Sequence, residues 1–269
     1  AKQRSEAIKL IREQQPKSTE ASIRLAEVSI ELRQFPKVDS ILSELETKDP
    51  WDWRIPWYQG RSLLAQKKGR EAKQAFDRVY FDLPGELAPK LALGLAAEQA
   101  KDYALAIQMY ALVLATDPSY VTAAFGLARC RSAQGDRAAA VAALEQVPQT
   151  SSLFTRSRVE SARILVDRDR TPPGIPELRK ASAAVEALTL EGMDRHRLTQ
   201  QVLETALHLV TSKSLPPQSD LAILGQPLQE VSLREGLEKV LRSMAHLSTG
   251  DEKIRLVDAA NKVRPKTLF

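Results

Sequence analysis

Two consecutive lines of 34 residues decide the fold: WRIPWYQGRSLLAQKKGREAKQAFDRVYFDLPGE (53–86) and LAPKLALGLAAEQAKDYALAIQMYALVLATDPSY (87–120). The alignment continues through the next line as far as Val147, so positions 34 residues apart form columns of similar side chains. The small columns are Gly60, Gly94, Ala128 and Ala72, Ala106, Ala140; the bulky column is Phe76, Tyr110, Leu144; the β-branched column is Val79, Val113, Val147.

A period of about 34 residues with this pattern is typical of the tetratricopeptide repeat, a helix–turn–helix unit. Small residues allow the two helices of a unit to approach closely, and the bulky column fills the gap to the next unit. A proline, at Pro84 and Pro118, ends the second helix because it cannot donate a helical hydrogen bond. We predict four units at about 19–52, 53–86, 87–120 and 121–154. The alternative is a helical bundle with coincidental spacing.

The whole chain is predicted to be all-α, because no run alternates apolar and polar residues in the manner of a strand. The expected organisation is an N-terminal helix or linker at 1–18, four repeats at 19–154, and a degenerate helix pair with C-terminal capping helices at 155–269. Repeat solenoids need end caps with one polar face, and the last helices suit that role. The stretch Ser214–Asp220, which contains Pro216 and Pro217, is expected to be a loop.

Composition excludes several classes of protein. The formal charge of +5 arises from 39 basic and 34 acidic residues with mixed signs, whereas a nucleic-acid binder concentrates its basic residues. No apolar run reaches the roughly 18 residues that span a bilayer. The single cysteine, Cys130, excludes an internal disulfide and fits a reducing, cytoplasmic location.

No pattern of catalytic or metal-binding residues is present. The sequence lacks a glycine-rich phosphate loop and the G-x-S-x-G nucleophile motif. The three histidines lie far apart, with no carboxylate or cysteine at ligand spacing. We therefore expect no catalytic residue, metal or cofactor in this chain. An enzymatic alternative would need a pocket around His196 and His208 in the C-terminal bundle.

The repeats predict a groove for a protein partner, because one face of each first helix lines the concave side of such an array. The candidate groove residues are Arg54, Trp57, Arg61, Leu95, Phe125 and Arg129. Planar guanidinium groups bind carboxylate and phosphate bidentately, so Arg61 and Arg129 would suit an acidic or phosphorylated segment. The alternative is a solvated face with no partner.

All three tryptophans lie between residues 51 and 57. The favoured interpretation is packing between the first two units. The other interpretation is a partner anchor, since tryptophan is enriched at interface hot spots. Of the three, Trp57 is the one expected to serve as an anchor.

Three segments resemble the C-terminal repeat domain of the bacterial protein kinase G family: DLPGELAPKLA (82–92), AAFGLAR (123–129) with Gly135-Asp136, and LVDAANKVRP (256–265). The resemblance covers roughly residues 51–269. It implies a modular Ser/Thr kinase with a rubredoxin-like metal domain, a kinase domain and this non-catalytic domain. In that family the repeat domain is associated with dimerisation and with recruitment of substrates such as forkhead-associated regulators.

This chain has neither kinase loop motifs nor paired cysteines, so the family's catalytic and metal residues have no counterpart here. The predicted function is therefore protein–protein interaction: docking of the kinase domain, a substrate or a second copy. The alternative is a free-standing tetratricopeptide-repeat adaptor that is not attached to a kinase.

Overall fold

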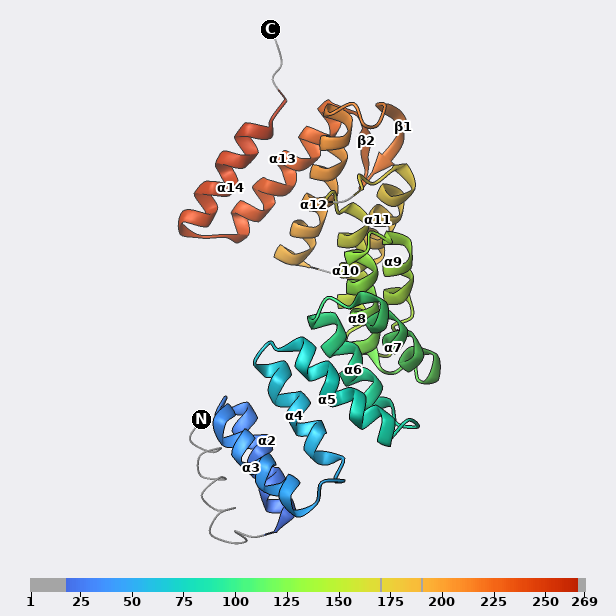
Figure 1. The fold of residues 1–269 in the computed structure, drawn as a ribbon. Helices are drawn as coiled ribbons and strands as arrows, with labels where there is room; N and C mark the ends of the chain where they lie inside the picture. The colour runs from blue at the N-terminus through green and yellow to red at the C-terminus, as the bar shows by residue number, and fades with distance from the viewer. Residues whose placement is uncertain (1–17, 170, 190, 266–269) are drawn as a thin grey trace. The chain divides into compact units, whose positions relative to one another are not determined.

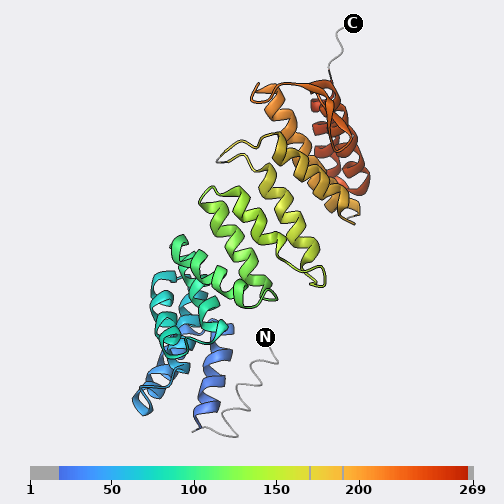
Figure 2. The same cartoon turned by 90° about the vertical axis from the view of Figure 1, so that its right-hand side faces the viewer.

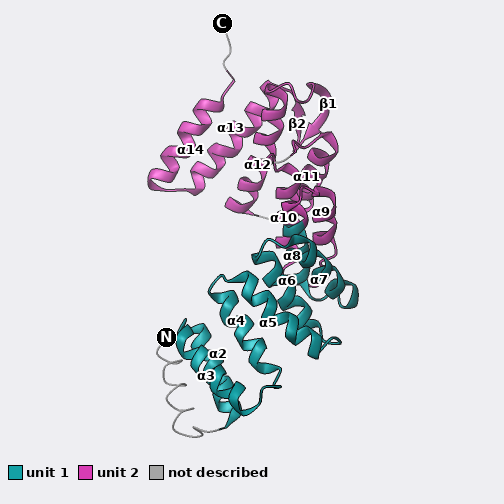
Figure 3. Cartoon of the chain, in the orientation of Figure 1, with its two compact units in different colours: residues 1–130 teal, residues 131–269 magenta. Residues whose placement is uncertain are grey.

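The computed structural model of the protein describes residues 18–169, 171–189 and 191–265. The predicted helix or linker at 1–18 lies outside them, apart from Ser18. The chain divides into two compact units, residues 1–130 (unit 1) and 131–269 (unit 2), coloured separately in Figure 3. This division falls inside the first helix of the fourth predicted repeat. The predicted domain limits at 18 and 154 therefore remain a prediction.

Unit 1 is built from helix pairs, and Figures 1 and 2 show the short connections between them. Its helices are α2 (Thr19–Glu31), α3 (Phe35–Lys48), α4 (Arg54–Ala65), α5 (Gly69–Asp82), α6 (Leu87–Gln99), α7 (Tyr103–Thr116) and α8 (Val121–Ala133). The pairs α2–α3, α4–α5 and α6–α7 pack within a repeat, and α3–α4 and α5–α6 pack between repeats. The first helices of successive repeats also contact each other: α2 contacts α4, and α4 contacts α6. The predicted helix-pair repeat is confirmed.

A left-handed backbone residue recurs in the turn inside each pair. These residues lie 34 positions apart: Arg33 (φ 56°), Lys67 (φ 62°), Lys101 (φ 62°) and Gly135 (φ 84°). In the third and fourth pairs an aspartate then caps the next helix. The Asp102 carboxylate accepts a hydrogen bond from the Leu105 N–H at 3.3 Å, and that of Asp136 from the Ala139 N–H at 3.0 Å. Only glycine adopts this conformation without steric cost, so three of the four turns carry strain.

The small and bulky columns meet in the core of unit 1. A Cβ atom added at Gly60 would lie 2.6 Å from Cζ of Phe76, and one added at Gly94 would lie 3.0 Å from Cε1 of Tyr110. At Gly126 of the next repeat an added Cβ would lie 2.4 Å from Cζ of the same tyrosine. The Tyr110 ring therefore lies against glycines of two repeats. The predicted close approach is confirmed at Gly60 and Gly94, and Tyr110 also fills the gap to the next repeat as its column predicted.

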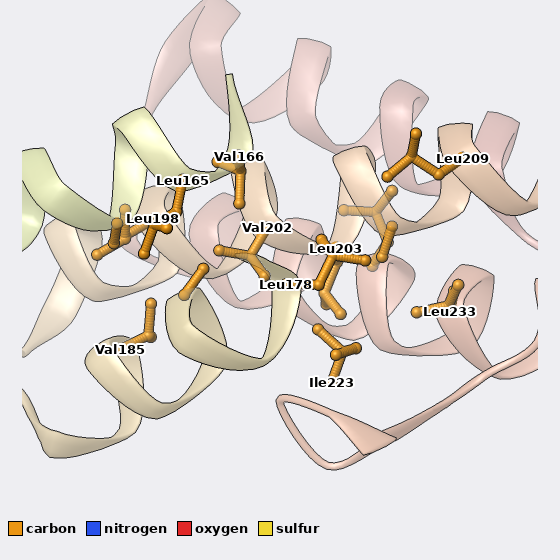
Figure 4. Close-up of a cluster of buried hydrophobic side chains, with 14 of the residues drawn as sticks. Leu165, Val166, Leu178, Val185, Leu198, Val202, Leu203, Leu209, Ile223 and Leu233 are labelled. Atoms are coloured by element: carbon orange, nitrogen blue, oxygen red, sulfur yellow. The ribbon is translucent and has the colours of Figure 1, made fainter. Parts of the chain in front are cut away.

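Unit 2 has a different core. Its helices are α9 (Arg137–Glu145), α10 (Phe154–Val166), α11 (Ile175–Ala187), α12 (Gly192–Thr211), α13 (Glu230–Leu247) and α14 (Gly250–Val263). Large aliphatic side chains from α10 to α13 interdigitate around α12, as Figure 4 shows for Leu178, Leu198, Val202 and Leu203. Each of these four side chains is at most 2% exposed. Branched aliphatic side chains make up most of this core, and fully buried alanines such as Ala162, Ala181 and Ala206 lie among them.

The expectation that the chain contains no strand is wrong, and so is the loop predicted through Asp220. Strands β1 (Gln218–Ile223) and β2 (Gln226–Leu228) form an antiparallel hairpin. Its two turn residues, Leu224 and Gly225, have φ of 50° and 73°, as in the primed turns that match strand twist. Two strands alone are marginal in water. This hairpin persists because β2 packs on α12 and α13, and because the Leu224 N–H donates to Oγ of Ser182 at 2.8 Å.

Candidate protein-interaction face

The six candidate groove residues lie on three first helices of unit 1. We call the surface they form the first-helix face. Spacings of three and four residues place Arg54, Trp57 and Arg61 on one side of α4, and Phe125 and Arg129 on one side of α8. Leu95 of α6 occupies the same column as Arg61 and Arg129. Trp57, Leu95 and Phe125 are half-buried, while the side chains of the three arginines are 31%, 32% and 52% exposed.

Ion pairs between neighbouring repeats run along this face. Nη1 of Arg61 donates to Oε1 of Glu27 at 3.1 Å, and Nη1 of Arg54 donates to Oε1 of Glu20 at 3.0 Å. Each pair joins residues 34 positions apart, which is one repeat. Arg54 also holds Asp52 through Nη2, at 2.7 Å from Oδ2, and this hydrogen bond lowers the pKa of the Asp52 carboxyl group. The repeat period therefore aligns an acid on one helix with an arginine on the next.

Arg129 binds a carboxylate in the bidentate manner. Its Nε lies 2.6 Å from Oε1 of Glu98, and its Nη2 lies 2.8 Å from Oε2. The same carboxylate accepts a hydrogen bond from the Tyr110 hydroxyl at 2.7 Å. Burial, together with this bond to a carboxylate, raises the pKa of Tyr110, so the phenol stays protonated. Helices α6, α7 and α8 are thereby joined at one acidic side chain.

The tryptophans are arranged differently from the prediction. Trp57, the expected anchor, packs its ring edge-on against Phe76 at a centroid distance of 5.5 Å. Trp51 and Trp53, expected to pack, are instead 91% and 41% exposed. The reason is that α4 begins only at Arg54, so the two earlier rings stand on the α3–α4 connection. The size of Trp51 and Trp53 does not predict their exposure, because exposure depends on the residue at which α4 begins.

Sequence reasoning overlooked Glu20, Asp52 and the Tyr110 hydroxyl as partners of this face. A signal for the first was present, since an acid precedes Arg54 and Arg61 by one full repeat. The Tyr110 bond could not be found in this way, because it joins positions 12 residues apart on two helices. Its geometry depends on how α6 and α7 cross.

Among the described residues there is no metal-ligand cluster and no membrane-spanning helix. Within residues 18–169, 171–189 and 191–265, no group of three His, Cys, Asp or Glu side chains could hold a metal ion. Every helix in that same part of the chain is too short or too polar to cross a lipid bilayer. Cys130 is buried beside this face, and burial raises the pKa of its thiol to about 12.

Helix pairs, left-handed turns and alternating small and bulky columns define a tetratricopeptide repeat protein. Solved structures agree. The C-terminal part of a tetratricopeptide repeat-containing protein from Cytophaga hutchinsonii superposes with a TM-score of 0.65 at 13% identity, over 95% of each chain. A tetratricopeptide repeat protein from Parabacteroides merdae gives a TM-score of 0.51 at 15% identity, over 75% of this chain and 78% of that one. At these identities the likeness shows the fold alone.

The chain belongs to the protein kinase G tetratricopeptide repeat family, whose sequence model matches residues 1–267. It is 36% identical over 255 residues to the serine/threonine-protein kinase PknG of Mycolicibacterium smegmatis, which covers 94% of this chain and 33% of that protein. The corresponding kinase of Mycobacterium leprae is 35% identical over 250 residues, 92% of this chain and 32% of the kinase. The chain thus spans about a third of the length of these relatives. As a repeat domain it is a non-catalytic protein-interaction fold.

Proposed function

We propose that this chain is the non-catalytic interaction domain of a cytoplasmic Ser/Thr protein kinase, and that it docks the kinase domain, a phosphorylation substrate or a second copy. Two relatives named as kinases support the proposal, since each matches over nearly the whole chain but extends well beyond it. The first-helix face is the proposed docking surface.

One observation carries this assignment: Arg61 and Arg129 already bind carboxylates, those of Glu27 and Glu98. A guanidinium group in such a position can release the carboxylate of its own chain and donate its hydrogen bonds to a partner's carboxylate or phosphate instead. Arg61 uses Nη1 for Glu27 and retains other donors for a partner. Arg61 and Arg129 are two repeats apart with Leu95 between them, so an acidic segment would lie along α4, α6 and α8 with an apolar residue at its centre.

The test is charge reversal at both arginines, Arg61→Glu with Arg129→Glu, and its probe is an acidic phosphothreonine peptide. Loss of about 1.4 kcal/mol at each arginine would weaken binding by about 100-fold in isothermal titration calorimetry. Helicity should be retained, whereas the melting temperature should fall modestly. Each reversal removes an ion pair worth about 1 kcal/mol and places a glutamate beside Glu27 or Glu98, which repels it. Equal affinity of the double variant and the unaltered protein would contradict the proposal.

A charge swap provides the matched control. In Glu27→Arg with Arg61→Glu the ion pair between α2 and α4 persists in reverse. The swap also removes the pair that Glu27 makes with Arg24, whose side chain is 70% exposed, so this loss should cost at most about 1 kcal/mol. Binding should still weaken about tenfold, because the cation has moved by one repeat. Unchanged binding would mean that only the total charge of unit 1 matters and that the position of Arg61 does not.

The intact mass of the endogenous protein distinguishes an attached domain from a free-standing adaptor. A mass far above 29.8 kDa, the mass of this chain, supports attachment to a kinase. The next step would then be to measure whether the kinase domain binds this chain when added separately. A mass near 29.8 kDa would make the chain a free-standing adaptor and reduce the kinase connection to ancestry.

A further inference from the structure

The most exposed aromatic rings of unit 1 border one hollow of about 380 Å³. We call it the aromatic hollow. One side is the α3–α4 connection with the first turn of α4, and the other is the C-terminal part of α5. The lining residues are Pro50, Trp51, Asp52 and Pro56 on the first side, and Asp77, Arg78, Phe81 and Asp82 on the second.

Trp51 and Phe81 are 91% and 85% exposed, although each ring offers a large apolar surface. The connection that carries Trp51 is held in place by hydrogen bonds. The Trp51 N–H donates to Oδ1 of Asp49 at 3.1 Å, and the Arg54 N–H donates to Oδ1 of Asp52 at 3.0 Å. The exposed indole therefore stands on a structured segment. A partner that covers the ring therefore does not also have to order the backbone of this segment.

The charges around the hollow favour a cation. Asp77 and Asp82 form no ion pair with any residue in the described part of the chain, whereas Asp52 is already occupied by Arg54. Among the described residues that line the hollow, Arg78 is the one that is basic. Two unpaired carboxylates beside two exposed aromatic rings are the chemistry that attracts a guanidinium, through ion pairing and through the negative face of the ring.

We propose that the aromatic hollow binds an arginine side chain on an extended segment of a protein partner, with apolar neighbours of that arginine covering Trp51 and Phe81. This surface requires the opposite charge to the first-helix face, so the proposal does not depend on the function proposed above. One partner could use both surfaces if it carried both charges.

The test is an NMR titration with a short peptide in which one arginine stands between two leucines. Each of the three tryptophans supplies an indole N–H signal, and Trp51→Phe assigns that of Trp51. The peptide should shift the Trp51 signal and leave that of Trp57 in place, because Trp57 lies on the first-helix face. A matched peptide with glutamate in place of arginine should leave the Trp51 signal unshifted. Equal shifts from both peptides, or none from either, would overturn the proposal.

Variants locate the binding groups. Asp77→Asn with Asp82→Asn should weaken the arginine peptide about tenfold, and Trp51→Ala should weaken it at least as much. Arg78→Gln should strengthen binding, since it removes a like charge. These side chains are exposed, so all the variants should melt as the unaltered protein does. Binding that is unaffected by the two aspartate substitutions, or by loss of the Trp51 ring, would rule out the aromatic hollow as the site.

Discussion

Units 1 and 2 are both helical, but their cores are built from different side chains. Unit 1 has small residues at its helix crossings, so that one ring, such as Tyr110, can lie against two glycines. Unit 2 fills its centre with leucine and valine from several helices and a hairpin. Close backbone approach requires a small residue, glycine or alanine, at the same place in each repeat, and this preserves the period. An aliphatic core tolerates many arrangements, so in unit 2 the period fades.

The two units can also be followed separately in solution. All three tryptophans and all five tyrosines lie within residues 1–130, so fluorescence reports on unit 1. Far-UV circular dichroism reports on the helices of both units. Substitutions in each core should therefore produce different changes in the two signals.

The largest effect is expected from Leu203→Ala in α12. Leu203 is 1% exposed in the unit 2 core, so its truncation leaves a cavity and should lower the free energy of unfolding by about 2–5 kcal/mol. Urea denaturation should show the dichroism midpoint falling further than the fluorescence midpoint. Equal shifts of both midpoints would mean that the units unfold as one body and that the contrast between their cores has no energetic consequence.

A smaller loss is expected from Gly126→Ala in α8. The new methyl group would lie 2.4 Å from the ring of Tyr110, which is fully buried and cannot move aside freely. Overpacking of this kind costs about 1–3 kcal/mol, and here the fluorescence midpoint should fall. Gly85→Ala is the control, because its added methyl group meets nothing within 4 Å. If both variants melted alike, small residues would not be what limits the helix crossings of unit 1.

The smallest effect, and a favourable one, is expected from Lys101→Gly. Lys101 has φ of 62° in the turn where Gly135 occupies the equivalent position of the next repeat. Relief of left-handed strain is partly offset by the greater backbone entropy of glycine in the unfolded chain, leaving a gain of about 0.5 kcal/mol. Thermal melting followed by fluorescence measures it. A lower melting temperature of the variant would show that the Lys101 side chain stabilises the fold by more than the strain of its left-handed backbone destabilises it.

Periodic packing is the part of this fold that can be predicted from the sequence. A 34-residue period specifies two helices and their turns, so the positions of Gly60, Gly94 and Phe76 follow from counting. The hairpin at 218–228 escaped prediction although Leu221 and Ile223 alternate with polar or small neighbours. Pro216 and Pro217 favoured a loop through Asp220, but the packing of β2 on α12 and α13 stabilises a hairpin there.

The residues of the first-helix face were predicted in the same manner, but the ion pairs that they form were not. Spacing placed Arg54, Arg61 and Arg129 on first helices, because side chains three, four or seven residues apart share one side of a helix. Their pairing with Glu20, Glu27 and Glu98 depends on the distance between neighbouring repeats, which no local pattern encodes.

The sequence by itself therefore determined the all-α repeat class, the helix turns and the family, since all three depend on residue identity at a fixed spacing. Only the tertiary structure decided that Trp51 is exposed while Trp57 is packed, and that Glu98 joins α6, α7 and α8. The physical reason is that the exposure of these rings depends on where α4 begins, and ion pairing depends on the distances between helices. Those distances result from the packing of many side chains together.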